Sequence, residues 1–140
     1  MRGVIFALLA SLVWGLAPVF IKIGLKSEVN NLLALAVHNL SAFLLASVLY
    51  MLIDGSFVIG SKEIVFLVLG GILSGFLGLF FFFEAIRHGN VSIVSPIAST
   101  SPLWSALFAF LILGESLNLQ KLLGVLLIIS GVALLTLSKT

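Results

Sequence analysis

The chain has 140 residues, of which 61% are hydrophobic and 9% are charged, with seven basic and five acidic side chains. A soluble domain carries about 25% charged residues, and a chain this short cannot bury so much apolar surface, so the composition excludes a water-soluble fold. The absence of cysteine excludes disulfides and thiolate metal sites. The charges lie scattered near the ends of apolar runs, so we expect the lipid bilayer as a partner and no nucleic acid.

Five apolar runs are long enough to cross a bilayer, which takes about 20 residues in a helix. They predict helices over about 3–23, 32–53, 64–86, 91–113 and 120–138. The first run resembles a signal peptide, but it lacks a small-x-small cleavage site followed by a polar chain, so we expect a retained helix. The expected fold class is therefore an all-α integral membrane protein, with five transmembrane helices in one domain over 1–140.

The first helix carries polar groups far from its ends. Trp14 lies about halfway across the membrane, where its indole N–H needs a partner. Two interpretations stay open: a Trp14 that faces a cavity and contacts substrate, or a Trp14 packed in the protein core. Pro18 is expected to kink the helix, and Lys22 is expected to extend toward the lipid headgroups.

The second helix contains the pair His38 and Asn39, a turn or more inside the membrane. Ionisable and amide side chains at this depth are functional candidates, and an imidazole can carry a proton near neutral pH. We therefore expect both residues to bind substrate, with His38 also a candidate proton or ion site. The alternative is a His38 at the membrane interface that bonds to a loop.

The third helix ends in a charged stretch, EAIRHG. Its Glu84 is the acid that the sequence places deepest in an apolar run. One interpretation pairs Glu84 with Arg87 or His88, three and four residues later; the other makes it a proton or ion site. Small residues on single faces of the third and fifth helices predict close helix packing: Gly71, Gly75, Gly78, Gly124 and Gly131.

The fourth helix contains SPIASTSPLW, in which two prolines flank a group of hydroxyl residues. Pro96 and Pro102 each remove a backbone hydrogen bond and are expected to kink the helix, which a membrane tolerates where hydroxyls, neighbouring helices or water replace the lost bonds. Two interpretations stay open for Ser95 and Ser99. They line a cavity and bind substrate, or they bond to their own helix or a neighbouring one.

The basic residues that orient membrane helices are nearly balanced between the two sides of the bilayer. With five spans, three fall on one side and four on the other: Arg2, Lys62 and Lys121 against Lys22, Lys26, Arg87 and Lys139. The positive-inside rule needs a clear excess. A single fixed orientation and insertion in both orientations, with head-to-tail pairing of inverted copies, therefore both stay open.

Motifs of enzymes are missing from the sequence, which contains no GxSxG, HExxH, Walker A or GxGxxG. No catalytic set is visible, so we expect no enzyme activity, no metal and no cofactor.

Two stretches resemble the EamA-like domain of the drug/metabolite transporter superfamily. They are WGLAPVFIKIGL, which begins at Trp14, and EAIRHGNVSIVSPIASTSPLWSALFAFLILGESLNLQKLLGVLLIISGVALL, which begins at Glu84. By position, Trp14, Ser95, Pro96 and Pro102 match the patterns of the family's first and fourth helices. Two departures stand out, because His38 or Asn39 replaces an arginine common at the start of the second helix and Glu84 stands where an uncharged residue is expected.

The resemblance implies a multi-pass secondary transporter of small-molecule metabolites in the cytoplasmic membrane, with export as the expected direction. Most members carry two five-helix repeats of opposite orientation, so the chain is similar to one half of an inverted-repeat transporter. A homodimer, in particular an antiparallel one, or a related small membrane protein would supply the other half. The alternatives are a flippase or accessory subunit that works with a second small membrane protein, and a structural membrane subunit.

Overall fold

The computed structural model describes residues 2–26, 28–53, 55–56 and 58–137, and this part of the chain contains helices and no strand. Five helical segments of 19 to 28 residues are long and apolar enough to cross a membrane: Arg2–Gly24, Asn31–Ile53, Ser61–His88, Val91–Leu113 and Leu119–Leu137. The expected fold class, an all-α membrane protein with five transmembrane helices, is confirmed. The expected end of the last helix, at 138, and the basic Lys139 lie outside the described residues.

The chain divides into two compact units, and the division falls inside α1 (Arg2–Gly24). One unit comprises 19–88, and the other comprises the residues up to Pro18 together with those from Gly89 onward. Pro18 itself lies inside α1 and is buried. The single domain expected over 1–140 stays a prediction.

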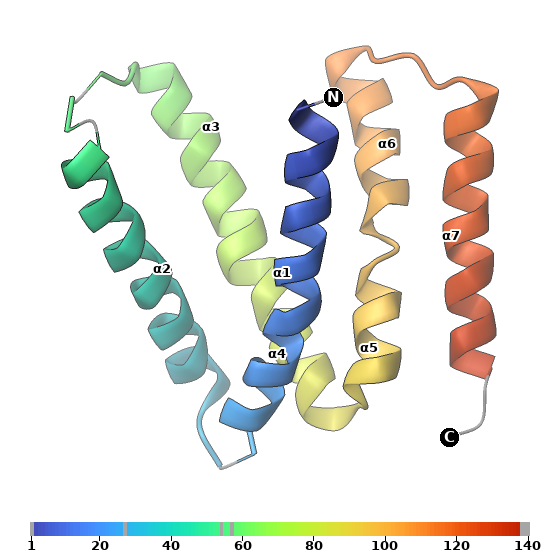
Figure 1. Ribbon diagram of the computed structural model, residues 1–140, viewed down its shortest axis with the longest axis horizontal. Helices are drawn as coiled ribbons and strands as arrows, with labels where there is room; N and C mark the ends of the chain where they lie inside the picture. The colour runs from blue at the N-terminus through green and yellow to red at the C-terminus, as the bar shows by residue number, and fades with distance from the viewer. Residues whose placement is uncertain (1, 27, 54, 57, 138–140) are drawn as a thin grey trace. The chain divides into compact units, whose positions relative to one another are not determined.

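The 19–88 unit contains the last turns of α1, then α2 (Asn31–Ile53), α3 (Ser61–Gly71), η1 (Ile72–Gly78) and α4 (Leu79–His88). The last three run on without a break, so they make one membrane span with a π-helical turn in its middle (Figure 1). The apolar run predicted a single regular helix at this place. π-Helical turns inside α-helices arise where an extra residue widens the turn, and they occur frequently at functional sites.

The core of this unit lies between α2 and α4, which pack against each other. Four apolar side chains are at most 6% exposed: Leu25, Leu35, Phe83 and Ile86. The start of α2 is fixed by Asn30, whose Oδ1 accepts a hydrogen bond from the backbone N–H of Leu32 at 2.8 Å. Asparagine is among the best helix N-caps for this reason, so the polar residues that end the connection also begin the second span.

The other unit contains α5 (Val91–Ala98), α6 (Ser101–Leu113) and α7 (Leu119–Leu137), and α5 packs against α7. α5 and α6 belong to one membrane span, but the chain leaves the helix at Ser99 and Thr100 (Figure 1). Pro96 lies inside α5 and Pro102 in the first turn of α6, where proline is favoured because the N–H that it lacks has no helical acceptor.

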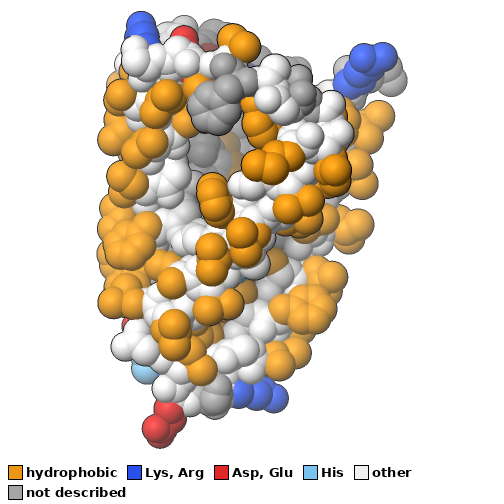
Figure 2. All heavy atoms as spheres, turned by 90° about the vertical axis from the view of Figure 1, so that its left-hand side faces the viewer, with side chains coloured by type: hydrophobic (Ala, Val, Ile, Leu, Met, Phe, Trp, Pro, Cys, Tyr) orange, Lys and Arg blue, Asp and Glu red, His pale blue; other side chains and the backbone are white. Residues whose placement is uncertain are grey.

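The five spans bury very little of their surface within the chain. At most 6% of the residues in each membrane-crossing window are buried. Figure 2, seen from the side of α2 and α3, shows hydrophobic side chains along this face and charged ones gathered at its ends. Apolar side chains are as stable against lipid tails as against one another, so this surface suits a bilayer and further membrane helices.

Candidate functional site

Lys22, near the end of α1, binds the end of α4. Its Nζ donates to the carbonyl oxygen of Ile86 at 2.6 Å and to that of Arg87 at 3.3 Å. The last carbonyls of a helix receive no hydrogen bond from an N–H of the same helix, and a lysine is a favourable donor to them. The Lys22 ammonium group is therefore held by the last turn of α4, at the end of the third span, and its extension toward the headgroups stays a prediction.

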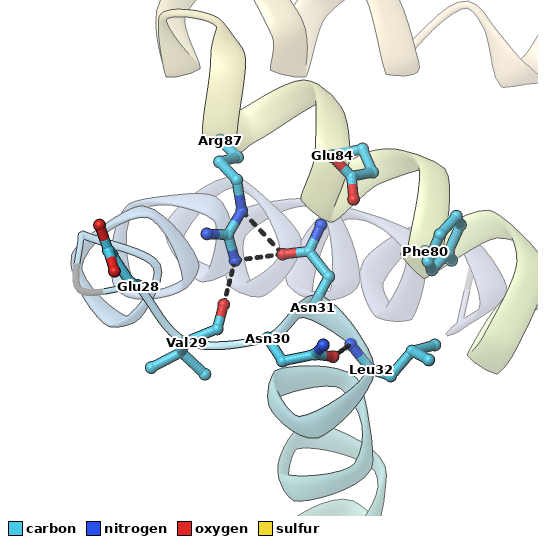
Figure 3. Close-up of a pocket in the computed structure, with 8 residues that line it drawn as sticks. All are labelled: Glu28, Val29, Asn30, Asn31, Leu32, Phe80, Glu84 and Arg87. Atoms are coloured by element: carbon cyan, nitrogen blue, oxygen red, sulfur yellow. Dashed lines mark hydrogen bonds between the residues drawn. The ribbon is translucent and has the colours of Figure 1, made fainter.

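Arg87 makes a second link, from α4 to the connection between α1 and α2 (Figure 3). Its Nε donates to Asn31 Oδ1 at 2.9 Å, and its Nη2 donates to Asn31 Oδ1 and to the carbonyl oxygen of Val29. Hydrogen bonds from a charged donor are the strong ones. Lys22 therefore fastens the end of α1, and Arg87 the α1–α2 connection, to the end of the third span; we call these two residues the cationic clamp.

Glu84 pairs with His88, one of the two partners that the sequence offered. Glu84 Oε2 lies 3.5 Å from His88 Nε2. The Glu84 side chain is 42% exposed, and it borders an open pocket of about 530 Å³ next to the cationic clamp. The same pocket is lined by Glu28, Asn31 and Phe80. The structure therefore puts Glu84 in a polar pocket at one end of the span, and its role as a proton or ion site stays a prediction.

His38 lines a different, mostly apolar pocket in the same unit. This open pocket of about 430 Å³ is bordered by α1, α2 and α4, and His38 is its one ionisable lining residue. The His38 ring is half-buried and meets the Phe83 ring edge-on, at 5.7 Å between ring centroids. Such a pocket suits an apolar or aromatic group that makes one polar contact with the imidazole.

Asn39 binds the π-helical turn. Its Nδ2 donates to the carbonyl oxygen of Gly75 at 2.7 Å, which joins the second span to the third. A Cβ at Gly75 would lie 3.5 Å from Asn39 Oδ1, an ordinary van der Waals contact, so α2 and η1 lie close together at this position. The Asn39 amide nitrogen is thus bonded within the protein, which leaves the amide oxygen as the group that can contact another molecule.

The other unit contains three of the predicted substrate-binding residues: Trp14, Ser95 and Ser99. His38 and Asn39 belong to the 19–88 unit. Trp14 is 74% exposed. The hydroxyl of Ser99 donates to the carbonyl oxygen of Ser95 at 2.9 Å, which corresponds to the interpretation that the hydroxyls bond to their own helix. This bond lies at the end of α5, where Ser99 is the C-cap residue, directly before the break between α5 and α6.

The glycines expected to pack helices differ in what surrounds them. Added Cβ atoms at Gly71, Gly124 and Gly131 would meet no atom of the chain within 4 Å. A Cβ at Gly78 would lie 3.1 Å from the carbonyl oxygen of Leu73, within the π-helical turn itself. The packing role of the first three, against another helix or another subunit, stays a prediction.

Sequence reasoning missed Asn31, Glu28 and the long-range partners of the cationic clamp. The connection that contains Glu28 and Asn31 shows only turn-forming and polar residues in the sequence, and helical spacing offers Arg87 only Glu84 as a partner. One signal was present: two asparagines in a row at the start of an apolar helix, of which one suffices for the N-cap. Among the described residues, no group of three or more His, Cys, Asp or Glu is placed to hold a metal ion.

Comparison with known proteins shows which family and which relatives the sequence is similar to. A family model described as the EamA-like transporter family matches residues 1–137. An uncharacterized protein of Methanocaldococcus jannaschii is 27% identical over 136 residues, which cover 97% of this chain and 97% of the relative. A protein of a Sinorhizobium species, described as an uncharacterized transporter in the cobO 3′ region, is 30% identical over 134 residues, or 93% of each chain. No solved structure matches the chain significantly.

Proposed function

We propose that the chain works as an oligomer of five-helix halves. It belongs to the EamA-like transporter family and is a multi-pass membrane transporter. The functional unit in this proposal is an antiparallel homodimer in the cytoplasmic membrane, and it exports small metabolites as a secondary transporter. No enzymatic step is part of the cycle. Each copy supplies one half of the path, as the two inverted repeats do in longer transporters.

The observation that carries the proposal is the exposure of Trp14 in the middle of the first span. Trp14 is 74% exposed, although an indole N–H in hydrocarbon needs a partner. A second copy of the chain supplies both the cover and polar groups for this position. The lengths of the relatives give further support, since both are matched over 93% or more of their own length and so have room for one five-helix unit each.

Substrate in this proposal binds near the midplane, against polar groups of both copies: Trp14, His38, Asn39, Ser95 and Ser99. The pocket beside His38 receives an apolar or aromatic portion of the substrate, because most of its lining is apolar. Asn39 contributes its Oδ1, since its Nδ2 is bonded to Gly75. Rocking of the two copies against each other then exposes the site to either side of the membrane in turn.

Orientation is the first experiment. Two reporters, one active only outside the cytoplasm and one active only inside, are fused in separate strains to the C-terminal end of the chain. The proposal expects signal from both, because the seven basic residues are divided three against four. Signal from one reporter alone would refute the antiparallel homodimer and direct the search to a partner of opposite orientation.

The site assignment is tested with purified protein in proteoliposomes that are screened against a panel of labelled metabolites. Combined replacement Trp14→Ala, Asn39→Leu and Ser95→Ala should abolish uptake of whichever metabolite the native chain moves. Ser47→Ala is the matched control, because the Ser47 hydroxyl bonds only to the carbonyl oxygen of Phe43 in its own helix. Normal transport by the triple variant would show that the substrate binds elsewhere.

A further inference from the structure

The polar pocket beside the cationic clamp contains a buried donor that the protein leaves unused. Asn31 is 9% exposed, and within the described residues its Nδ2 has no hydrogen-bond partner. An unpaired buried donor costs roughly as much as a lost hydrogen bond. Such groups are rare in folded proteins and call for a partner that is not part of the chain.

The direction of this donor is fixed by Arg87. Both Nε and Nη2 of Arg87 donate to Asn31 Oδ1, and a guanidinium has donors only. The oxygen of the amide must therefore face Arg87, so the amide cannot be turned over and its nitrogen faces the opposite way. Figure 3 shows this nitrogen on the side of Glu84, at the wall of the pocket.

A carboxylate lies on the side of the pocket that the donor faces. Glu84 and Glu28 both line the pocket, and Figure 3 shows Glu84 on the side of the Asn31 amide nitrogen and Glu28 on the other side of Arg87, where it borders a second pocket with Lys22 and Lys26. Phe80 adds an aromatic ring to the lining, and ring faces attract cations. The pocket volume of about 530 Å³ far exceeds the roughly 30 Å³ that one water molecule occupies. The pocket is thus built for a cation that also carries a hydrogen-bond acceptor.

We propose that this pocket binds a primary ammonium group with an adjacent oxygen acceptor, the chemistry of ethanolamine. The ammonium group donates to the Glu84 carboxylate, and the oxygen accepts from Asn31 Nδ2. The pocket lies where α2 begins, at Asn31, and α4 ends, at His88. This is the end of the membrane spans, so a free amino alcohol and the ethanolamine headgroup of a phospholipid can both reach it. The site is separate from the midplane site proposed for transport and does not depend on it.

Binding of soluble probes to the full chain tests the proposal without any transport assay. The chain is placed in phosphatidylcholine nanodiscs and titrated, by ligand-observed NMR, with ethanolamine, ethylammonium and ethylene glycol. Ligands this small bind at about millimolar concentrations, which this method measures. Ethanolamine should bind about 3- to 10-fold more tightly than ethylammonium, because it alone satisfies the Asn31 donor. Ethylene glycol, which has no charge, should not bind measurably.

Asn31→Asp removes the Nδ2 donor and keeps an oxygen that can accept the hydrogen bonds from Arg87. The carboxylate keeps an acceptor for Arg87 and replaces the pocket-facing N–H by an oxygen, so the fold is retained. Because the hydroxyl of ethanolamine can itself donate to the new carboxylate, this comparison uses 2-methoxyethylamine, whose ether oxygen only accepts. The native chain should bind it more tightly than ethylammonium, and Asn31→Asp should bind the two equally. A preference for 2-methoxyethylamine that survives in Asn31→Asp would overturn the role of the buried donor.

Glu84→Gln tests the charge. The variant should weaken both amines by about threefold or more, the scale of a partly exposed ion pair. Glu63→Gln is the matched control, since it makes the same charge change at the other end of the third span and should leave both affinities unchanged. Equal effects of the two variants, or no amine binding to the native chain at all, would refute the pocket as an ammonium site.

The two sources of the headgroup chemistry are distinguished by changing the lipid. If phosphatidylethanolamine supplies the group in membranes, adding it to the nanodiscs should weaken the apparent binding of free ethanolamine severalfold, and Glu84→Gln should remove this competition. Unchanged binding of ethanolamine in these nanodiscs would assign the pocket to soluble amino alcohols and exclude the lipid.

Discussion

Replacing Asn39 by leucine should weaken the packing of the second span on the third. The substitution removes the hydrogen bond from Asn39 Nδ2 to the carbonyl oxygen of Gly75, which is 2.7 Å long and part-buried. Side-chain hydrogen bonds between membrane helices contribute about 0.6 kcal/mol on average and about 1.7 kcal/mol at most. We place the Gly75 bond at the upper end of this range, because it is short and part-buried. We expect the free energy of unfolding to fall by about 1–1.7 kcal/mol.

The measurement is reversible unfolding of the purified chain in mixed micelles, followed by circular dichroism. A loss of about 1.4 kcal/mol lowers the folding equilibrium constant about tenfold, which the titration resolves. Ser47→Ala on the same helix is the control, because its hydroxyl bonds within α2, and it should change stability by less than about 0.5 kcal/mol. If Asn39→Leu and Ser47→Ala have the same effect, the bond to Gly75 does not stabilise the contact between the spans.

Three further outcomes follow from the same structure. Arg87→Met should destabilise the chain by roughly 2–3 kcal/mol in the same unfolding assay, because it leaves the buried Asn31 oxygen without its charged donor; a loss below 0.5 kcal/mol would show that the link is not formed in solution. Lys22→Met should speed hydrogen exchange in the last turn of α4, whose carbonyls lose their ammonium partner, and unchanged exchange there would contradict the contact. Pro102→Ala restores a backbone N–H, which can donate to the carbonyl of Ala98 if the helix continues through the break. Hydrogen exchange at the break between α5 and α6 should therefore be slower in the variant. Equal exchange rates in the variant and the native chain would mean that Pro102 does not cause the break.

The sequence predicts the five spans well because run length and composition decide them, and both are local properties. The π-helical turn escapes such reasoning, since Gly75 looks like any small residue until the amide of Asn39, 36 positions earlier, is found on its carbonyl. Arg87 escapes it for the same reason: its partner Asn31 lies 56 positions away, whereas helical spacing suggests only Glu84. The substrate-binding assignments of Trp14 and the other midplane residues stay predictions.

The cationic clamp also constrains the order in which parts of the protein fold during synthesis. Asn31 leaves the ribosome 56 residues before its partner Arg87, and chains are synthesised at about 5–20 residues per second. For roughly 3–11 s, therefore, the turn between the first two spans exists without the hydrogen bonds that Arg87 later donates to Asn31 and Val29. During this interval water can hydrate these groups at the end of the first helical hairpin, and the link to Arg87 forms only after the end of the third span has been synthesised.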